Sequence, residues 1–375
     1  MIAHAKLGAS NSHRWLNCPG SVAAEAALSG GRKSSVFADE GSVAHELADL
    51  CLSGGLNPFD FEGKTLIENN AVAVDREMCV HVQTYIDYVQ SIPGAHEYER
   101  RVDYSDWVPD GFGTSDVIAI DGDTIHIVDL KYGKGVEVYA KDNSQMMLYA
   151  LGAYSEYACI QEINTVRMSI VQPRRDHIDE WEMTVSDLLK WAAWVSEQAE
   201  LALSDSAPRS PGEKQCQFCA AKATCPALEA YTRKIIGGDF DNLDDPDALP
   251  DERVSAALAA KKLIIGWLDA VEQHVADRLE SGKGFPGFKL VAGRSLRQWG
   301  DETKAEEVLT NLVGQEAYTR KLVSPAQAEK MLGKAKAADI ADLIVKPEGR
   351  PTIAPESDKR PAINLTNDDF DCLQS

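Results

Sequence analysis

Two β-rich segments joined by a tight turn restrict the possible folds of this chain more than any other feature. Residues 114–120 read TSDVIAI, residues 124–130 read TIHIVDL, and Asp121-Gly122-Asp123 separates them. Asp-Gly between two such runs is a strong hairpin signal, because glycine adopts the left-handed backbone that a two-residue turn requires. The sequence therefore predicts an antiparallel pair of strands within 114–130.

The segments around the hairpin predict helices and further strands. Apolar residues recur at helical spacing in two stretches, 36–56 (Val43, Leu47, Leu50 and Leu52) and 72–91 (Val82, Ile86 and Val89). Strands are also expected at 96–104, 136–140 and 163–172, and helices at 142–159 and 184–204. This alternation predicts an α/β fold in which helices flank a mixed central β-sheet.

Proline and acidic stretches divide the rest of the chain. Pro208 and Pro211 interrupt it before a cysteine-rich segment, and residues 239–251 form an acidic, proline-containing run. A helix is expected at about 252–281, and the polar segment from residue 346 onward is rich in proline. We therefore predict a first domain at 1–235, a linker at 236–251, a mainly helical region at 252–345 and a polar tail at 346–375.

The composition is that of a globular protein, and the charge is strongly acidic. Hydrophobic residues make up 44% of the 375 residues, and no stretch approaches the roughly 20 apolar residues of a membrane span. The first residues lack the apolar core of a signal peptide, so we expect a soluble, cytoplasmic protein without a membrane partner.

A net charge of −21 argues against a protein that only coats DNA. Non-specific DNA binding depends on Lys and Arg neutralising phosphates. A nuclease, by contrast, needs carboxylates to hold its metal ion. An acidic nuclease is expected to act on DNA that a partner delivers.

A carboxylate–lysine set follows from the hairpin. Alternate residues of a strand share one face, so Asp129 and Lys131 point to the same side while Leu130 points to the core. The hairpin brings Asp116 close to Asp129, and two such carboxylates suit Mg²⁺ or Mn²⁺. A divalent ion polarises a phosphodiester and generates hydroxide, and a lysine beside it can orient water or stabilise charge. Taken alone, Asp-x-Lys is also common at solvated strand ends.

The ordered set of motifs resembles the RecB-like branch of the PD-(D/E)xK nucleases over about residues 10–228. The matching segments are Gly41-Ser42-Val43-Ala44-His45, Gly113-Thr114-Ser115-Asp116, Asp129-Leu130-Lys131, and Gln145 with Tyr149. The sequence departs from that pattern at Ser115, where proline is usual, and at Asp129, where glutamate is commoner.

The resemblance implies a restriction-endonuclease-like core and a role for each matching residue. It implies that His45, Asp116, Asp129 and the Leu130 carbonyl bind the metal, and that Lys131 is the catalytic lysine. Gln145 and Tyr149, four apart on one helix face, are implied to lie beside the active site towards DNA. Glu99 is a possible additional acid.

Three of the eight cysteines lie within ten residues, at Cys216, Cys219 and Cys225. In a cytoplasmic protein such clustering indicates a metal rather than a disulfide framework. A four-cysteine site needs one more ligand, and zinc is the first general reading of this spacing. The remaining cysteines, apart from Cys18, are interpreted as ordinary thiols.

The same resemblance changes the expected cofactor. RecB-like nucleases of the AddB and CRISPR-associated types hold a [4Fe–4S] cluster with one cysteine before the nuclease core and three after it. Cys18, in Trp15-x-x-Cys18-Pro19, is the matching N-terminal position. The resemblance thus implies a structural cluster held by Cys18, Cys216, Cys219 and Cys225, with zinc as the alternative.

The C-terminal region resembles an uncharacterised phage and prophage protein family, which extends the match to the whole chain. The matching segments are Gly287-Phe288-Lys289-Leu290, Gly293-Arg294-Ser295 and Ser357-Asp358-Lys359-Arg360-Pro361. The leading hypothesis is a metal-dependent DNA nuclease, favoured as an exonuclease, that works with a phage single-strand annealing or replication protein. The alternatives are a catalytically silent DNA-binding or assembly module and a phage scaffold protein with a structural ion.

Overall fold

The computed structural model describes residues 5–28, 36–68, 70–236, 251–289 and 304. The chain divides into two units between Phe285 and Pro286, and every element described below belongs to the first. The predicted linker, most of the region 252–345 beyond its first helix, and the tail lie outside the described residues.

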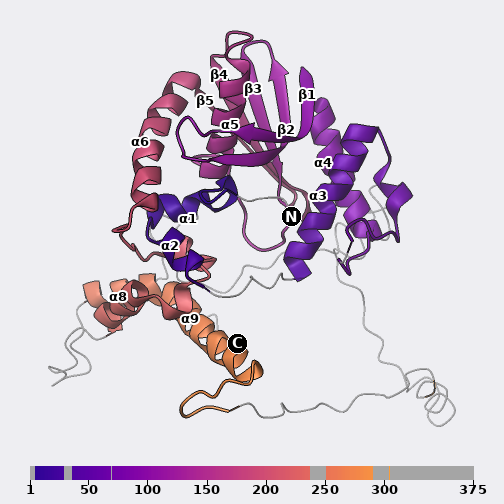
Figure 1. The fold of residues 1–375 in the computed structure, drawn as a ribbon. Coiled ribbons are helices and arrows are strands. Elements are labelled where there is room, and N and C mark those ends of the chain that lie inside the picture. Colours follow the sequence, from indigo (N-terminus) through magenta and orange to yellow (C-terminus); the bar gives the residue numbers. More distant parts are fainter. Residues whose placement is uncertain (1–4, 29–35, 69, 237–250, 290–303, 305–375) are drawn as a thin grey trace, which may run out of the picture. The chain divides into compact units, whose positions relative to one another are not determined.

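A five-stranded mixed sheet forms the centre of this unit, as the alternation of strands and helices predicted (Figure 1). Its strands lie in chain order, β1–β2–β3–β4–β5, and only the β3–β4 pair is parallel. Their bounds are β1 (Ala95–Asp103), β2 (Phe112–Asp121), β3 (Thr124–Leu130), β4 (Thr165–Gln172) and β5 (His177–Thr184). The predicted hairpin is confirmed: Val117 of β2 pairs with Val128 of β3, and Gly122 in the turn has φ +58°.

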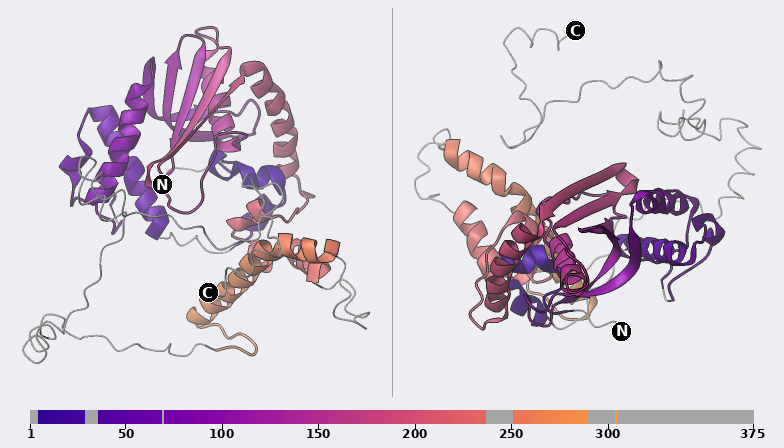
Figure 2. Two further views of the ribbon diagram at one scale, coloured as in Figure 1. Left: turned by 180° about the vertical axis from the view of Figure 1, so that it is seen from behind. Right: turned by 90° about the horizontal axis from the view of Figure 1, so that it is seen from above.

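Helices cover both faces of the sheet (Figures 1 and 2). One face carries Val117, Val128 and Leu130, which pack against α3 (Val36–Gly54) and α4 (Arg76–Ser91). The opposite face carries a second set of apolar side chains, which pack against α1 (Ser12–Asn17), α5 (Ser144–Tyr157) and α6 (Val185–Leu203). The two cores confirm the α/β fold class.

Side-chain caps fix where the helices begin. The Asp75 carboxylate accepts a hydrogen bond from Met78 N at the start of α4, and Thr184 Oγ1 accepts one from Asp187 N at the start of α6. Asn143 accepts from the amides of Gln145 and Met146 at the start of α5. Such caps satisfy backbone donors that have no partner inside the helix, and the Asn143 cap sets the helix turn that carries Gln145.

The predicted strand at 136–140 is wrong, because these residues form part of the loop between β3 and α5. Side chains of the β4–β5 hairpin bind the backbone of this loop in place of a neighbouring strand. Gln172 Oε1 accepts from Val138 N at 3.1 Å, and Asp179 Oδ2 accepts from Ala140 N at 2.7 Å. Because side chains already bind these backbone amides, the segment does not pair with a neighbouring strand of the sheet.

Several elements have no counterpart in the sequence-based prediction. Among them are β5 and the short helices α1, α2 (Ser21–Ala26), α7 (Glu213–Gln217) and α8 (Pro226–Ile236). The helix expected at 252–281 is confirmed as α9 (Asp251–Glu280), which contacts α7 and α8. In the part of the chain described, none of the helices has the length and apolar character that a membrane crossing demands.

The N-terminal segment closes onto the chain that follows α6. Gly20 N donates to Pro208 O at 2.8 Å, and a Cβ at Gly20 would lie 2.6 Å from Ala207 O. Because the obstructing atom belongs to the backbone, no side-chain movement relieves it. Only glycine allows this approach of residues 18–21 to residues 207–210.

A buried polar chain joins β3, β4 and α4. His126 Nε2 lies 2.6 Å from Ser169 Oγ, and the Tyr88 hydroxyl lies 2.7 Å from the same oxygen. Burial, together with the positive charge of Arg167, lowers the pKa of His126 to about 4. The neutral imidazole is therefore part of the folded core.

The first prediction concerns this histidine and acid stability. The unfolded chain takes up the His126 proton near the ordinary pKa of about 6.5, well above the folded value, so stability is lost as pH falls through this window. Between pH 7 and pH 5 the wild type should lose on the order of 2 kcal/mol more stability than His126→Gln, measured by urea denaturation at both pH values. His274→Gln, at an exposed position of α9, serves as the control and should keep the wild-type difference. A His126→Gln variant with the full wild-type loss would contradict the prediction.

The second prediction concerns the closure at Gly20. Gly20→Ala should lower the free energy of unfolding by about 1–3 kcal/mol, because the added methyl group overlaps backbone atoms. Gly266→Ala is the matched control: it lies inside α9 with nothing within 4 Å of the added Cβ. It should raise stability slightly, since alanine is the better helix former. Equal thermal midpoints for the two variants would contradict the proposed closure.

Candidate functional site

The hairpin register brings the two predicted aspartates together. Val117 pairs with Val128, so Asp116 and Asp129 are the next residues along each strand and lie beside one another. Asp116 Oδ2 accepts a hydrogen bond from Leu130 N at 2.7 Å. This bond fixes one oxygen of Asp116 and leaves the other, Oδ1, to face away from β3.

His45 and Glu99 lie beside Asp116. His45 Nδ1, on α3, lies 3.4 Å from Asp116 Oδ1. One potential ligand atom from each of His45, Glu99 and Asp116 lies within 4.8 Å of the others. Among the described residues this is the single such group of three His, Cys, Asp or Glu side chains. These three side chains could hold a metal ion.

Glu99 occupies an unusual position in β1. The β1–β2 pairing runs from Tyr98 with Val117 directly to Arg100 with Ser115, and skips the pair formed by Glu99 and Asp116. Glu99 has φ +44°, in the left-handed region that non-glycine residues rarely adopt. Strain of this kind costs about 1–3 kcal/mol and tends to occur at functional sites. It turns the Glu99 backbone out of the regular strand beside Asp116.

The three groups shift one another's ionisation. Burial alone would lower the pKa of His45, but the Asp116 charge outweighs it and raises that pKa to about 9. Burial likewise opposes ionisation of Asp116, yet His45 and the Leu130 amide lower the Asp116 pKa. Partial burial and the charge of Asp116 raise the pKa of Glu99 to about 7. The site is thus a compact, partly dehydrated pair of carboxyl groups beside a protonated imidazole, and a metal ion that binds there would take the place of the imidazole proton.

A second set of contacts joins Asp129, Lys131, Gln145 and Tyr149. Lys131 Nζ lies 2.7 Å from Asp129 Oδ2 and donates to Gln145 Oε1 at 3.0 Å. Gln145 Nε2 in turn lies 3.1 Å from Asp129 Oδ1 and 3.2 Å from the Tyr149 hydroxyl. Sequence spacing predicted that α5 presents Gln145 and Tyr149 on one face, and the structure places both beside the strand end.

Burial dominates the electrostatics of this second set. The Asp129 residue is only 2% exposed, and burial, partly offset by Lys131, raises its pKa. Burial would lower the pKa of Lys131, but the Asp129 charge reverses the effect and raises it. Lys131 is therefore an ammonium ion, which suits it to stabilise negative charge rather than to take up a proton.

Glycine allows Tyr149 to reach this position. A Cβ at Gly113 would lie 2.6 Å from Tyr149 Cε1. The glycine that opens the Gly113-Thr114-Ser115-Asp116 motif therefore leaves space for the tyrosine ring.

Two residues outside the predicted site set hold the loop between Lys131 and Asn143. Gln172 is 2% exposed, and its Nε2 donates to the carbonyls of Gly133 and Val136. Arg175 donates to the carbonyls of Lys134 and Gly135. Neither residue carries a periodic or motif signal, because both act through backbone contacts made 36–41 positions away. They fix the connection between the lysine and the glutamine of the site.

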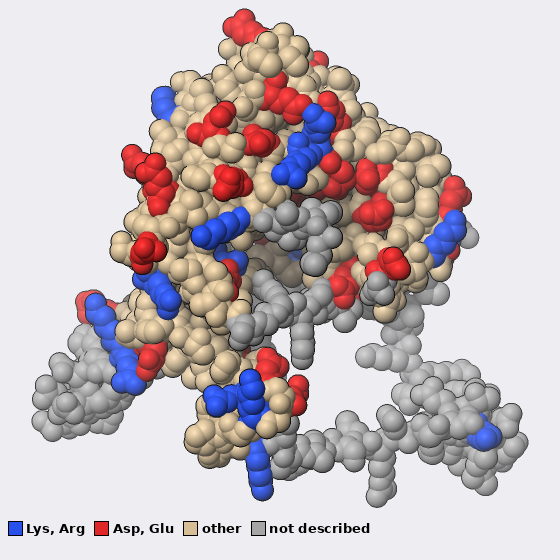
Figure 3. Space-filling view, viewed as in Figure 1, with Lys and Arg blue, Asp and Glu red and all other residues tan. Residues whose placement is uncertain are grey.

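Several basic residues of the first unit form ion pairs with carboxylates of the same protein. Four of these pairs are Arg14–Glu25, Lys134–Glu77, Arg174–Glu40 and Arg175–Glu137. On the face shown in Figure 3, acidic and basic side chains are interspersed, and the acidic ones predominate over the sheet region. The described residues of this face form no continuous basic track.

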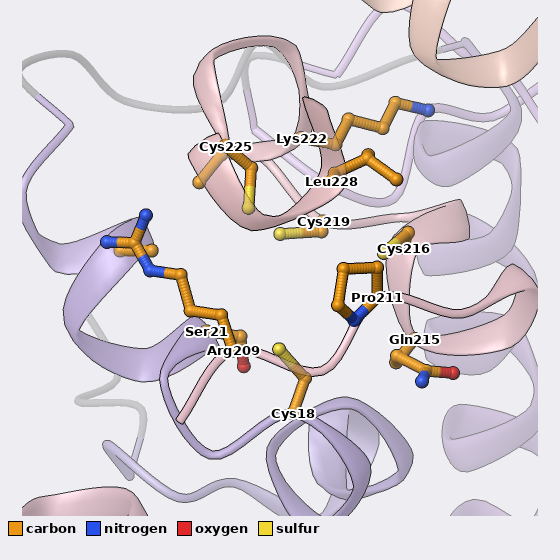
Figure 4. Close-up of a pocket in the computed structure, with 12 residues that line it drawn as sticks. Cys18, Ser21, Arg209, Pro211, Gln215, Cys216, Cys219, Lys222, Cys225 and Leu228 are labelled. Carbon is orange, nitrogen blue, oxygen red and sulfur yellow. The ribbon is translucent and has the colours of Figure 1, made fainter. Parts of the chain in front are cut away.

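The four predicted cysteines converge from two distant parts of the chain. Cys18 follows α1, and Cys216, Cys219 and Cys225 lie on and after α7. All four line one hollow (Figure 4). Backbone amides donate to two of the sulfur atoms, Ser210 N to Cys18 Sγ at 3.3 Å and Gly212 N to Cys216 Sγ at 3.5 Å. The described cysteines form no disulfide.

The chain is similar to a solved structure and to a protein family. A solved structure titled "Crystal structure of SSO0001" aligns with 59% of this chain and 85% of its own at 14% identity, with a TM-score of 0.28. A likeness at that TM-score carries no argument. A family model described as "Protein of unknown function (DUF2800)" matches residues 4–361. This match confirms the prediction that a single uncharacterised family covers nearly the whole chain. The chain belongs to the DUF2800 family of proteins of unknown function.

Proposed function

We propose that this protein is a metal-dependent DNA nuclease of the RecB-like PD-(D/E)xK type. The observation that carries the proposal is the convergence of six predicted residues from four separate elements. His45 comes from α3, Asp116 from β2, Asp129 and Lys131 from the end of β3, and Gln145 and Tyr149 from α5. A fold without chemical function has no need to gather a lysine, a glutamine and two aspartates at one strand end.

The residues present fit a hard divalent cation such as Mg²⁺ or Mn²⁺. The ligand atoms of His45, Glu99 and Asp116 already lie within 4.8 Å of one another. Asp129 and the Leu130 carbonyl lie on the adjacent strand and would complete the oxygen-rich set. A cation bound there would polarise the phosphodiester and lower the pKa of a water molecule.

The protein's own groups have distinct roles in this proposal. Lys131, held as an ammonium between Asp129 and Gln145, stabilises the charge that develops on the phosphate. Gln145 orients Lys131 through its amide oxygen and Asp129 through its amide nitrogen, and the Tyr149 hydroxyl accepts a second hydrogen bond from that nitrogen. Burial of Asp129 beside Lys131 excludes water and strengthens each of these interactions.

We propose an exonuclease that acts in phage recombination or replication and receives DNA from a single-strand annealing or replication protein. Two observations support reliance on a partner. The net charge is −21, and Lys134, Arg174 and Arg175 are paired with carboxylates of this protein. Both weaken direct attraction to DNA phosphates.

We also propose that the four cysteines hold a [4Fe–4S] cluster rather than zinc. Tetrahedral zinc with bonds of about 2.3 Å brings its sulfur ligands to about 3.8 Å from one another. Among the described residues no three cysteine sulfurs lie within 4.8 Å of one another. The sulfur atoms of the four cysteines are therefore farther apart than a single zinc ion requires. Amide groups that donate to Cys18 and Cys216 would stabilise thiolates in a cluster.

The third prediction tests catalysis. Asp129→Asn and Lys131→Met keep side-chain size but remove the two charges, so each should lower Mg²⁺- or Mn²⁺-dependent DNA cleavage at least about 100-fold. The measurement uses labelled linear, circular and single-stranded DNA with the full-length protein. Asp121→Ala and Lys190→Ala, at exposed positions, are the controls and should cleave like the wild type. Absence of cleavage by the wild type, or equal cleavage by all variants, would favour a catalytically silent DNA-binding or assembly module.

The fourth prediction tests the cluster. Protein purified without oxygen should be brown and contain four iron atoms and four sulfides per chain. Serine at Cys18, Cys216, Cys219 or Cys225 should remove most of the visible absorption, whereas Cys159→Ser, at an exposed cysteine, should leave it unchanged. Colourless protein that contains one zinc ion per chain would show that the site holds zinc.

A further inference from the structure

A buried tyrosine of α4 has no partner for its hydroxyl group among the described residues. Tyr85, on α4, is 1% exposed and is among the largest fully buried side chains. Its hydroxyl oxygen is shielded from solvent and makes no hydrogen bond within the described part of the protein. An unsatisfied buried hydroxyl costs about 1–3 kcal/mol, so its presence calls for an explanation.

The surroundings of Tyr85 point to the cation site. Its ring belongs to the core cluster that includes Val117, Val128 and Leu130, the immediate chain neighbours of Asp116 and Asp129. Burial, followed by the charges of Asp116, Asp129 and Glu99, raises the pKa of Tyr85. The charged groups with the strongest influence on this hydroxyl are therefore the three carboxylates of the site.

The same carboxylates lie beyond direct hydrogen-bonding reach of the hydroxyl, since none of them is its partner. A gap of this kind between polar groups is commonly bridged by a water molecule. Mg²⁺ and Mn²⁺ sites of this type retain several water ligands, because these ions give up their hydration reluctantly. A cation held by His45, Glu99 and Asp116 would bring such water molecules close to the carboxylates that act on the Tyr85 hydroxyl.

We propose that Tyr85 is a positioning residue of the cation site, and that its hydroxyl donates a hydrogen bond to a water molecule bound to the cation. This inference rests on the proposed function for the presence of the cation. It adds a residue outside the nuclease motifs and assigns α4 a role in metal binding. The hydroxyl is unsatisfied in the protein alone and acquires its partner when the cation binds.

The test separates metal affinity from the stability of the metal-free protein. Tyr85→Phe should weaken Mn²⁺ binding about 2- to 10-fold, which corresponds to the loss of one hydrogen bond. The metal-free variant should be at least as stable as the wild type, because the change removes an unsatisfied group from the core. Mn²⁺ affinity is measured by calorimetry or electron paramagnetic resonance, and stability by thermal unfolding in the presence of a chelator.

Tyr98→Phe is the matched control. Tyr98 is partly buried against the same cluster, but its hydroxyl lies 3.4 Å from His96 Nδ1. This variant should bind Mn²⁺ like the wild type. Equal affinity of Tyr85→Phe and the wild type would overturn the inference, and so would a loss of metal-free stability in Tyr85→Phe.

The outcomes also distinguish this inference from the proposed function. A wild type that binds Mn²⁺ but does not cleave DNA would overturn the nuclease and leave the role of Tyr85 intact if the Tyr85→Phe affinity falls. A wild type that binds no Mn²⁺ would overturn both.

Discussion

The ion pair between Asp129 and Lys131 is the constraint on which the arrangement of the site depends. Asp129 is almost completely buried, and Lys131 Nζ lies 2.7 Å from it. A carboxylate in this setting is tolerated only when its charge is compensated and its oxygens are bonded. Gln145 bonds one oxygen and Lys131 neutralises the other, so α5 has to begin where its first turn reaches the end of β3. The Asn143 cap and the side chains of Gln172 and Arg175 secure that placement.

The parts of the fold that depend on local chemistry could be predicted. The hairpin followed from Asp121-Gly122-Asp123, and α4 followed from Val82, Ile86 and Val89, all of which are buried. The strand expected at 136–140 fails because long-range side chains bind its backbone. β5 was missed because none of its residues is fully buried and acidic side chains such as Asp179, Glu180 and Glu182 interrupt the apolar alternation of a strand with one buried face.

In the site, too, some residues could be predicted from local sequence motifs and others depend on contacts between distant segments. The order of motifs led to His45, Asp116, Asp129, Lys131, Gln145 and Tyr149, and the structure brings them together. Glu99 was only a possible addition, since its place beside Asp116 depends on a left-handed backbone within a strand that no composition signals. Tyr85 gave no signal at all, because on α4 it continues an apolar stripe and its hydroxyl matters only in relation to β2 and β3.

The closure of the first residues onto the cysteine-rich segment has a consequence for synthesis in the cell. Ribosomes release the chain from its N-terminus, so the segment around Cys18 and Gly20 emerges long before Pro208 and Cys216. The segment around Cys18 stays without its partner until almost 200 further residues have been translated. Contacts between residues so distant in sequence are also slow to form. The apolar side chains of Trp15 and Leu16, buried in the finished fold, are then open to chaperones or to premature partners. The proposed cluster, which would join the two segments, could be inserted only at the end of this interval, and its supply would then be a late checkpoint in the maturation of the protein.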